Sequence, residues 1–600
     1  ADPAPAAPRP ARPATPAPAA DHLRDPVPVE TGLSPSTRQN RPLLPRVVRP
    51  PAPGAAALSG RRTAVLTLLC FAVTAACGLQ QWSAVLLGGF DLGIFHQGVA
   101  GYAHLGLPIS PVKSYHHEFP PAFSLLGDHF SPILAALAPL YWIWEDPRTL
   151  LLGQALLLAA GVPLIRRIAV RCFTPPTDGS GTDSTGTGTA DGDPAGTDPA
   201  RLRTVRLVAD LAGLVYGLGW PLLAAGRGGF HEVAFAVPLT LLMFERGLAR
   251  RYGTAALAAA LLCLTKEDLG LLVGMYGLVL LWRGRPRGDR QGERAGDRRT
   301  LAYGAGLLIG GPLASALAIV ALIPAMGGQP DYYWVYGPLG PDAGTAFGNV
   351  LGDPLLLVQV ATNATVKPLL LLWLFGTLLL LPLRSATTLC LLPLLAERVL
   401  SDNPNHWSIA HHYDAFLWPV LLTATLEALG RLHARGGLHR RTGYGLGTAA
   451  VAISLVSSLA LGGISLLTPA FWRPSASNTA LVRGAAQIPD GALVEADNQV
   501  VPRLVGRTDV VLVDGVPRGR DYVLIRSDTR TFPFQTSAEQ AERIELLLAH
   551  GYRQVWGEHG VVLLHRESDE PVPGARVPDD SSTPVKEIVP SDVGHNLFKG

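Results

Sequence analysis

The sequence predicts a mainly α-helical, polytopic membrane protein with about eleven transmembrane helices and a small extracytoplasmic α/β domain near the C-terminus. Hydrophobic residues make up 48% of the 600 residues and charged residues 16%, and the mean hydropathy is +0.25. This composition is typical of a chain that crosses a membrane many times. Arginine clusters separate the apolar runs, as the positive-inside rule expects of cytoplasmic loops.

Charge and cysteine content exclude two other classes of protein. The net charge of +3 is too small to indicate a nucleic-acid partner, so membrane lipid is the expected partner. The five cysteines lie inside or beside apolar segments, which excludes a disulfide framework in the loops. They are Cys70, Cys77, Cys172, Cys263 and Cys390.

The composition along the chain predicts four parts. Residues 1–58 are rich in Ala, Pro and Arg and should form a disordered cytoplasmic tail. Residues 59–470 contain the apolar runs, 471–567 resemble a soluble α/β domain, and 568–600 should be a disordered tail. The α/β prediction depends on short β-prone runs and on one helix with a capping box at Ser537–Gln540.

Alternation of apolar runs and basic clusters predicts the path through the membrane. The predicted spans are 63–87, 149–164, 207–225, 233–248, 254–265, 269–282, 301–326, 368–383, 387–400, 417–429 and 446–467. A Gly-, Thr- and Asp-rich insertion at 173–200 is predicted to be flexible and cytoplasmic. The stretches 89–147 and 327–367 are predicted to be large external loops.

An acidic residue, Asp91, follows the first predicted span directly, within the run FDLGIFHQ. A carboxylate at the edge of an apolar span is costly unless it faces water, a metal or a polar partner, so it indicates a functional site. The alternative is that Asp91 only caps the next helix, since helix starts often recruit Asp.

Other acidic, histidine and lysine residues fall on the same predicted side as Asp91. They are His96, His116–Glu118, Asp128, His129, His231, Glu232, Lys266–Asp268 and His406–His412. Each cluster lies where a predicted helix meets water, so together they could line one cavity at the outer surface. Ionisable groups there suit chemistry on a substrate with a polar head and a lipid tail, whereas a transporter would hold such groups nearer the bilayer midplane.

Four motifs resemble those of a large family of uncharacterised bacterial and archaeal polytopic membrane proteins, which is grouped with the GT-C superfamily of membrane glycosyltransferases. The motifs are FDLGIFHQ, HFSPILAALAPLYWIW at 129–144, GGFHEVAFAVPL at 228–239 and TKEDLGLL at 265–272. The resemblance extends from about residue 63 to about residue 565. It implies a GT-C-like helical bundle that uses a polyprenyl-phosphate-linked sugar as donor.

The resemblance also implies roles for single residues. Asp91 occupies the position of the general base that draws a proton from the acceptor hydroxyl in an inverting transfer. Lys266, with His129, is the predicted ligand of the donor phosphate for a different reason: a compact cation at the head-group level can neutralise the charge that develops there. The alternative is a lysine at a helix end that simply reaches toward the interface. The residues predicted to support the cavity are His96, His231, Glu232, Glu267, Asp268, His411 and His412.

A metal and sugar-stacking rings are further expectations. His231, Glu232 and Asp91 offer ligand types that suit a divalent metal, although no fixed ligand spacing such as HExxH is present. Aromatic faces for sugar rings are predicted at Tyr332, Tyr333, Trp334 and Trp407, which could equally belong to an interfacial aromatic belt.

The function predicted from these observations is transfer of a sugar from a polyprenyl-phosphate donor to an envelope glycan or protein. The protein should lie in the bacterial inner membrane, with the active side and the C-terminal domain extracytoplasmic. Two alternatives stay open: a transporter or flippase for a lipid-linked envelope intermediate, and a non-catalytic envelope assembly protein whose polar clusters only pack.

Overall fold

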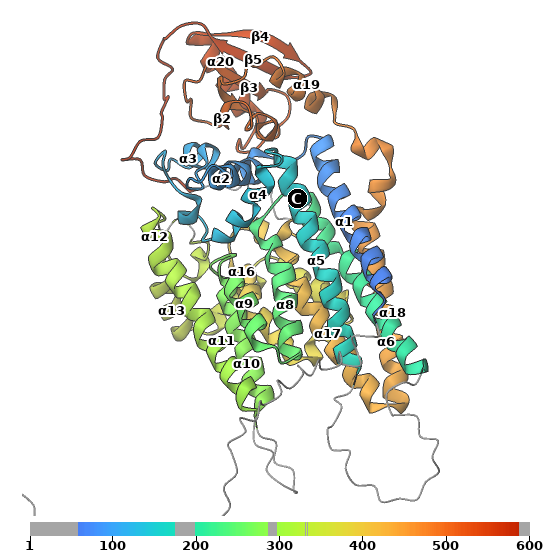
Figure 1. The fold of residues 1–600 in the computed structure, drawn as a ribbon. Helices are drawn as coiled ribbons and strands as arrows, with labels where there is room; N and C mark the ends of the chain where they lie inside the picture. Colours follow the sequence, from blue (N-terminus) through green and yellow to red (C-terminus); the bar gives the residue numbers. More distant parts are fainter. Residues whose placement is uncertain (1–57, 175–198, 286–296, 330–331, 333, 587–600) are drawn as a thin grey trace, which may run out of the picture. The chain divides into compact units, whose positions relative to one another are not determined.

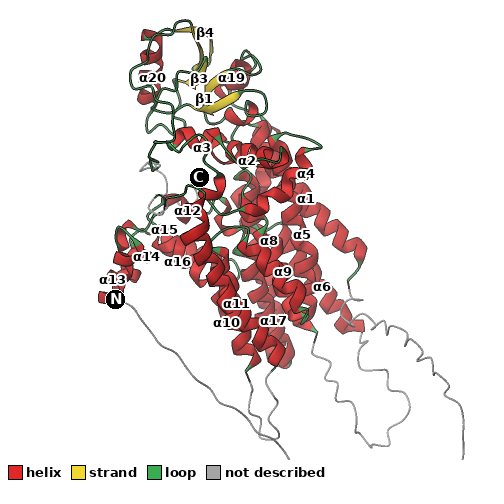
Figure 2. Cartoon of the chain, turned by 60° about the vertical axis from the view of Figure 1, so that its left-hand side comes forward, coloured by secondary structure: helices red, strands yellow, loops and turns green. Residues whose placement is uncertain are grey.

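The computed structural model describes residues 58–174, 199–285, 297–329, 332 and 334–586. All of them belong to one of the two units into which the chain divides, residues 51–600. The predicted tail at 1–58 and the insertion at 173–200 lie almost entirely outside the described residues. In the described part, strands occur only in the C-terminal region and helices make up most of the rest (Figure 2).

Six helical segments are long and apolar enough to cross a membrane. They are built from α1 (Gly60–Ser83), α5 (Pro147–Phe173), α6 (Pro199–Gly217) with α7 (Trp220–Arg227), α11 (Arg298–Leu317) with its extension to Ala325, α17 (Trp418–Arg435) and α18 (Gly437–Ser458). A seventh candidate is the pair α14 (Leu355–Thr362) and α15 (Val366–Gly376), which bends by 85°. The eleven predicted spans are therefore not confirmed.

The remaining helices are shorter. They are α2 (Ile94–Ala103), α3 (Pro111–His116), α4 (Ala138–Tyr141), α8 (Ala236–Leu248), α9 (Tyr252–Cys263), α10 (Leu269–Gly284), α12 (Ile323–Ala325), α13 (Ala343–Gly352) and α16 (Leu392–Leu400). Predicted spans at 233–248, 254–265 and 269–282 correspond to α8, α9 and α10. Each is too short to cross about 30 Å of hydrocarbon as a straight helix along the membrane normal.

Local sequence explains where α5 begins and how two other helices pack. Asp146 caps α5 by accepting the backbone N–H of Arg148, with Pro147 at the first helical position, as the Asp-Pro pair predicts. Small residues let α10 approach α11: a Cβ at Gly270 would lie 2.3 Å from the Gly311 carbonyl oxygen, and one at Gly277 2.4 Å from the Leu308 nitrogen. Such seams are common between helices in membranes.

The C-terminal region forms a five-stranded mixed sheet in the order β2-β1-β3-β5-β4. Its elements are α19 (Ala476–Ala485), β1 (Leu493–Ala496), β2 (Asp509–Leu512), β3 (Tyr522–Arg526), α20 (Ser537–Ala549), β4 (Tyr552–Glu558) and β5 (Val561–Arg566). Strands β1, β2 and β3 pair in parallel, and β5 pairs antiparallel with β3 and β4. The small sheet predicted for this region is confirmed.

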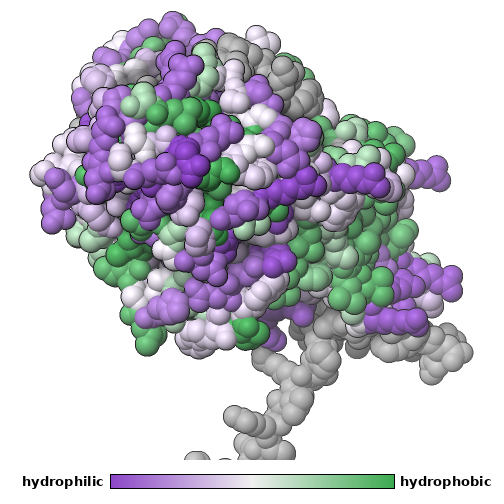
Figure 3. Space-filling model, turned by 90° about the horizontal axis from the view of Figure 1, so that it is seen from above, coloured by the Kyte–Doolittle hydropathy of each residue, from purple (hydrophilic) through white to green (hydrophobic). Residues whose placement is uncertain are grey.

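The sheet region packs on the loops that follow α1 (Figure 1). The Arg518 guanidinium pairs with Glu118 at 2.8 Å, and His116 contacts Asp514 at 3.0 Å. Residues 568–586, within the predicted disordered tail, return to the same loops, where the Val585 N–H donates to the His117 carbonyl at 2.8 Å. Viewed from this side, hydrophilic residues cover much of the molecule and hydrophobic residues show on the helices beyond the sheet region (Figure 3).

The helical region has two ends, which carry different features. We call the end that holds Asp91 the site end; the chain reaches it through α1 and leaves it through α5. We call the opposite end the cavity end, because the starts of α1 and α18 and the last turn of α17 line a cavity there.

Candidate functional site

Asp91 lies in the turn η2 (Gly89–Gly93), between the end of α1 and the start of α2. Its backbone has φ 87° and ψ −86°, a conformation that costs a non-glycine residue about 1–3 kcal/mol and persists only where its surroundings impose it. Residues held in this way concentrate at functional sites. The backbone therefore marks Asp91 independently of its charge.

The C-terminal domain holds this turn in place. The Gly89 N–H donates to the Asn498 carbonyl at 2.7 Å, and the Phe90 N–H donates to Asn498 Oδ1 at 2.9 Å. A Cβ at Gly89 would lie 2.4 Å from Cγ1 of Val501, so glycine is needed for this close approach. The conformation of Asp91 thus depends on contacts from a distant part of the sequence.

His231 is the nearest ionisable partner of Asp91. Its Nε2 lies 3.8 Å from Asp91 Oδ2, too far for a hydrogen bond, and its ring stacks on His412 with centroids 3.4 Å apart. Gln154 of α5 fixes the loop: it accepts the His231 N–H at 3.1 Å and donates to the Gly229 carbonyl at 2.5 Å. We call Asp91, His231, His411 and His412 the Asp91 group.

Burial sets the charge states in the Asp91 group. The surrounding protein raises the pKa of Asp91 to about 6, although His411 and Lys113 oppose the rise and 49% of the side chain is exposed. Burial also lowers the pKa of His231 to about 4, against the effect of Glu232. At neutral pH Asp91 is therefore mostly a carboxylate next to a neutral imidazole.

Lys266 lies next to the Asp91 group, between α9 and α10, among acidic side chains. Burial acts to lower its pKa, but Asp268, Glu232, Glu267 and Glu397 raise it well above its usual value. The ammonium charge is thus offset by several carboxylates, which suits an ionic network better than a site for a phosphate. We call these five residues, with His129, the Lys266 group.

His129 is tied to Glu267, which joins the loop after α3 to the turn before α10. His129 Nδ1 lies 2.8 Å from Glu267 Oε1, and the Phe130 N–H donates to Glu267 Oε2 at 3.1 Å. Burial acts to raise the pKa of Glu267, but His129 and Lys266 lower it to about 2. The predicted phosphate ligand His129 is therefore engaged by a carboxylate.

Asp268 and Glu397 form a carboxyl–carboxyl pair in the Lys266 group. Their side chains hydrogen-bond to each other, which requires that the pair hold a proton. Burial raises the pKa of Asp268, while Lys266 acts against the rise. Glu397 is not among the residues predicted from the sequence, although a single acid inside the apolar run 387–400 is a signal for such a site.

A buried ion pair positions the segment that carries His411 and His412. Arg398 of α16 pairs with Asp414, and its Nε donates to the His406 carbonyl at 2.8 Å. Both charged side chains are almost fully buried, where an ion pair is retained only with good geometry and further hydrogen bonds.

Other predicted site residues lie outside these two groups. His96 is buried beside Tyr141, with 3.0 Å between Nδ1 and the hydroxyl. Tyr332 contacts Phe119 and His117 edge-on, Trp334 donates to the Gly340 carbonyl, and Trp407 lies under the Lys367 ammonium. These rings already pack against protein, and the side chain of Tyr333 lies outside the described residues.

The predicted metal ligands do not fit a metal centre. Among the described residues, no group of three or more His, Cys, Asp or Glu side chains is placed to hold a metal ion. His231 and Asp91 are near each other, and Glu232 acts electrostatically on both His231 and Lys266. We therefore derive no chemical step through a metal.

The fold and the two polar groups define an integral membrane protein with ionisable residues gathered at one end of its helices. A family model described as "Predicted membrane protein (DUF2079)" matches residues 83–563. Since the match covers most of the chain, the protein belongs to this family. A comparison with curated proteins finds no match.

Proposed function

We propose that the protein is a membrane glycosyltransferase of GT-C type, which moves a sugar from a polyprenyl-phosphate donor to an extracytoplasmic acceptor of the bacterial envelope. The observation that carries the proposal is the state of Asp91: a strained, half-exposed carboxylate with a pKa raised to about 6. A general base works best when its pKa lies near the working pH.

In the proposed reaction, Asp91 accepts the proton of an acceptor hydroxyl. The hydroxyl oxygen then forms a bond to the anomeric carbon of the sugar, while the bond from that carbon to the phosphate oxygen breaks. Polyprenyl phosphate leaves with the electron pair, and the anomeric configuration inverts. His231, 3.8 Å from Asp91, would be near enough to orient the acceptor. The carboxylates around Lys266 argue against that residue as the partner of the leaving phosphate.

The test is transfer of radiolabelled sugar by the purified chain in detergent, with a panel of polyprenyl-phosphate hexoses and pentoses as donors and envelope fragments as acceptors. We expect Asp91→Asn to reduce transfer about 10²- to 10⁴-fold, the usual contribution of a general base. Glu145→Gln is the matched control, since Glu145 lies near the same end and makes an exposed contact with His104. Activity of Asp91→Asn equal to that of wild type would remove the proposed base.

A transporter of a lipid-linked intermediate is the second candidate, and the Lys266 group favours it. A lysine among carboxylates, with Asp268 and Glu397 sharing a proton, resembles the relays that couple proton movement to transport. The two candidates differ in detergent, where no compartments exist. A transferase keeps its turnover there, whereas a transporter shows activity only when the chain is in sealed vesicles.

A further inference from the structure

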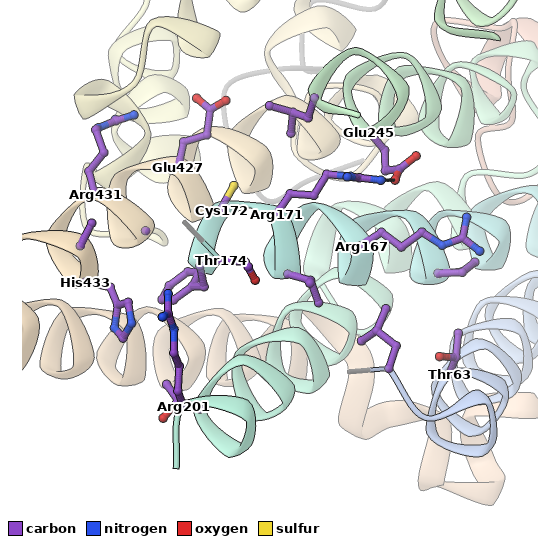
Figure 4. Close-up of a pocket in the computed structure, with 18 of the residues that line it drawn as sticks. Thr63, Arg167, Arg171, Cys172, Thr174, Arg201, Glu245, Glu427, Arg431 and His433 are labelled. Carbon is purple, nitrogen blue, oxygen red and sulfur yellow. Dashed lines mark hydrogen bonds and ion pairs between the residues drawn. The ribbon is translucent and has the colours of Figure 1, made fainter. Parts of the chain in front are cut away.

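A large cavity lies at the cavity end of the helices, away from the Asp91 and Lys266 groups. Its volume is about 2030 Å³, above the usual range for small-molecule sites. The walls come from the first turns of α1, α6 and α18 and from the last turns of α5, α8, α10 and α17. Figure 4 shows side chains that line it.

The lining of this cavity is strongly basic. Nine arginines and two glutamates contribute to it: Arg167, Arg171, Arg201, Arg246, Arg250, Arg251, Arg283, Arg431, Arg440, Glu245 and Glu427. The positive-inside rule explains arginines at the cytoplasmic ends of helices. It does not require that arginines from six different helices and from the turn after α8 border one cavity.

Both glutamates are already engaged by arginines. Arg171 and Arg246 approach Glu245 at 2.7 and 2.5 Å, and Arg283 approaches Glu427 at 2.7 Å. Figure 4 shows Arg171 turned toward Glu245. Their ion pairs are therefore formed with Arg171, Arg246 and Arg283 and not with the other arginines of the lining.

Several arginines have no acidic partner in the described part of the chain. Arg167 of α5, Arg201 of α6 and Arg431 of α17 form no ion pair with a described residue, and Arg431 donates only to the Arg384 carbonyl. Their side chains enter the cavity from three helices (Figure 4). Guanidinium groups bind phosphate through paired N–H donors, which makes arginine well suited to phosphate recognition.

We propose that this arginine-lined cavity binds a phosphate-bearing anion. Basic pockets between helices at the cytoplasmic face are known to take phospholipid headgroups, and apolar side chains of Ala64 and Leu68 in the lining would face the start of an acyl chain. A soluble phosphate would use the same guanidinium groups. The shared chemistry is the phosphate, and the experiment distinguishes the two sources.

The purified full chain in a neutral detergent is titrated with dioleoyl-phosphatidylglycerol, dioleoyl-phosphatidylcholine or inorganic pyrophosphate, and the thermal midpoint and native mass spectra are recorded. A ligand that binds only the folded state raises the midpoint. Binding of phosphatidylglycerol but not of phosphatidylcholine or pyrophosphate identifies a lipid headgroup. Saturable binding of pyrophosphate identifies a soluble phosphate.

The test variant is Arg167→Gln/Arg201→Gln/Arg431→Gln, which leaves both glutamates paired. We expect its apparent Kd for the anion that binds to rise about tenfold or more, since each charge-assisted hydrogen bond contributes measurably to affinity. The matched control, Arg299→Gln/Arg435→Gln/Arg441→Gln, removes the same charge from positions near the same end that do not line the cavity, and we expect wild-type binding.

Two results would overturn the proposal: no anion binds the wild-type chain, or the two triple variants lose binding equally. If the test variant does not fold, arginine modification of the wild-type chain by phenylglyoxal gives a second measurement. The bound anion should protect Arg167, Arg201 and Arg431 but not Arg299 or Arg435, as mapped by mass spectrometry. Equal modification with and without the anion would contradict the site.

Discussion

Asp91 combines backbone strain with a perturbed pKa, both of which are concentrated at functional sites, and its side chain is open to solvent. Its φ is positive, its carboxylate is half exposed, and its pKa is raised to about 6. The raised pKa means that folding disfavours the charged form, so above about pH 6 the native state is less stable than it would be with a neutral side chain. A residue that costs stability at neutral pH is expected where function requires it.

The raised pKa of Asp91 predicts how the rate of sugar transfer depends on pH. If Asp91 is the base, sugar transfer should rise with pH through about 6 and level off above it, because only the deprotonated carboxylate accepts a proton. The measurement is the rate of transfer in detergent between pH 4.5 and 8. The midpoint should persist in Glu145→Gln and in Glu397→Gln; a shift in Glu397→Gln alone would assign the titration to the Asp268–Glu397 pair instead.

The same pKa predicts a stability effect that separates a functional from a structural role. Between about pH 4 and 6 the native state binds more protons at Asp91 than the unfolded state does, so this residue makes stability fall as pH rises. Asp91→Asn removes that term. We expect its thermal midpoint at pH 7.5 to equal or exceed that of wild type, whereas a lower midpoint would mean that the carboxylate supports the fold.

At the scale of elements, the sequence predicted helix starts and strands better than it predicted contacts. The Asp146–Pro147 start of α5 is confirmed, and α20 begins one residue earlier than its capping box suggested, with Thr536 as the cap. The Asn498 contacts to η2 could not be predicted, since they join distant segments through backbone groups that any sequence possesses. Glu397 differs, because a single acid in the apolar run 387–400 is visible in the sequence, whereas its pairing with Asp268 depends on where the fold places α16.

The docking of the C-terminal domain on η2 gives a prediction of its own. Gly89→Ala adds a methyl group that would lie 2.4 Å from Val501 Cγ1, and extra atoms in a packed contact cost about 1–3 kcal/mol. We expect faster trypsin cleavage between the helices and the sheet region, together with slower sugar transfer. Gly506→Ala, where no atom lies within 4 Å of the added Cβ, is the control; equal cleavage of the two variants would contradict the docking.

At the scale of the whole described region, the two ends constrain how often the chain crosses the membrane. The start of α1 lines the cavity end, whereas the chain after α18 meets the end of α1, where Gln80 donates to the Phe471 carbonyl and Ser83 to that of Trp472. The first and last long helices thus leave the C-terminal domain on the side opposite to the start of α1. Six crossings, one for each long apolar helical segment, would leave both on one side.

An odd number of crossings is therefore required, and shorter elements must contribute. Helices α8 and α10 run from the site end toward residues that line the cavity, Arg246 and Arg283, although each is shorter than a standard span. A helix shorter than the hydrocarbon layer can still cross where the bilayer is locally thinner, and the buried faces and flanking arginines of α8 and α10 are compatible with this. The eleven spans predicted from the sequence satisfy the parity, and so does a count of seven.

Cysteine labelling tests this parity directly. In a cysteine-free background, an impermeant maleimide applied to intact cells should label Glu542→Cys, which is exposed on α20, and should leave Arg299→Cys, at the start of α11, unlabelled until the membrane is opened. The positive-inside rule places the arginine-lined cavity on the cytoplasmic side of the membrane. The end of the helices that holds Arg299 should therefore be inaccessible from outside. Labelling of both positions from outside would place the two ends on one side of the membrane. The predicted placement of the acidic and basic clusters on opposite sides of the membrane would then be wrong.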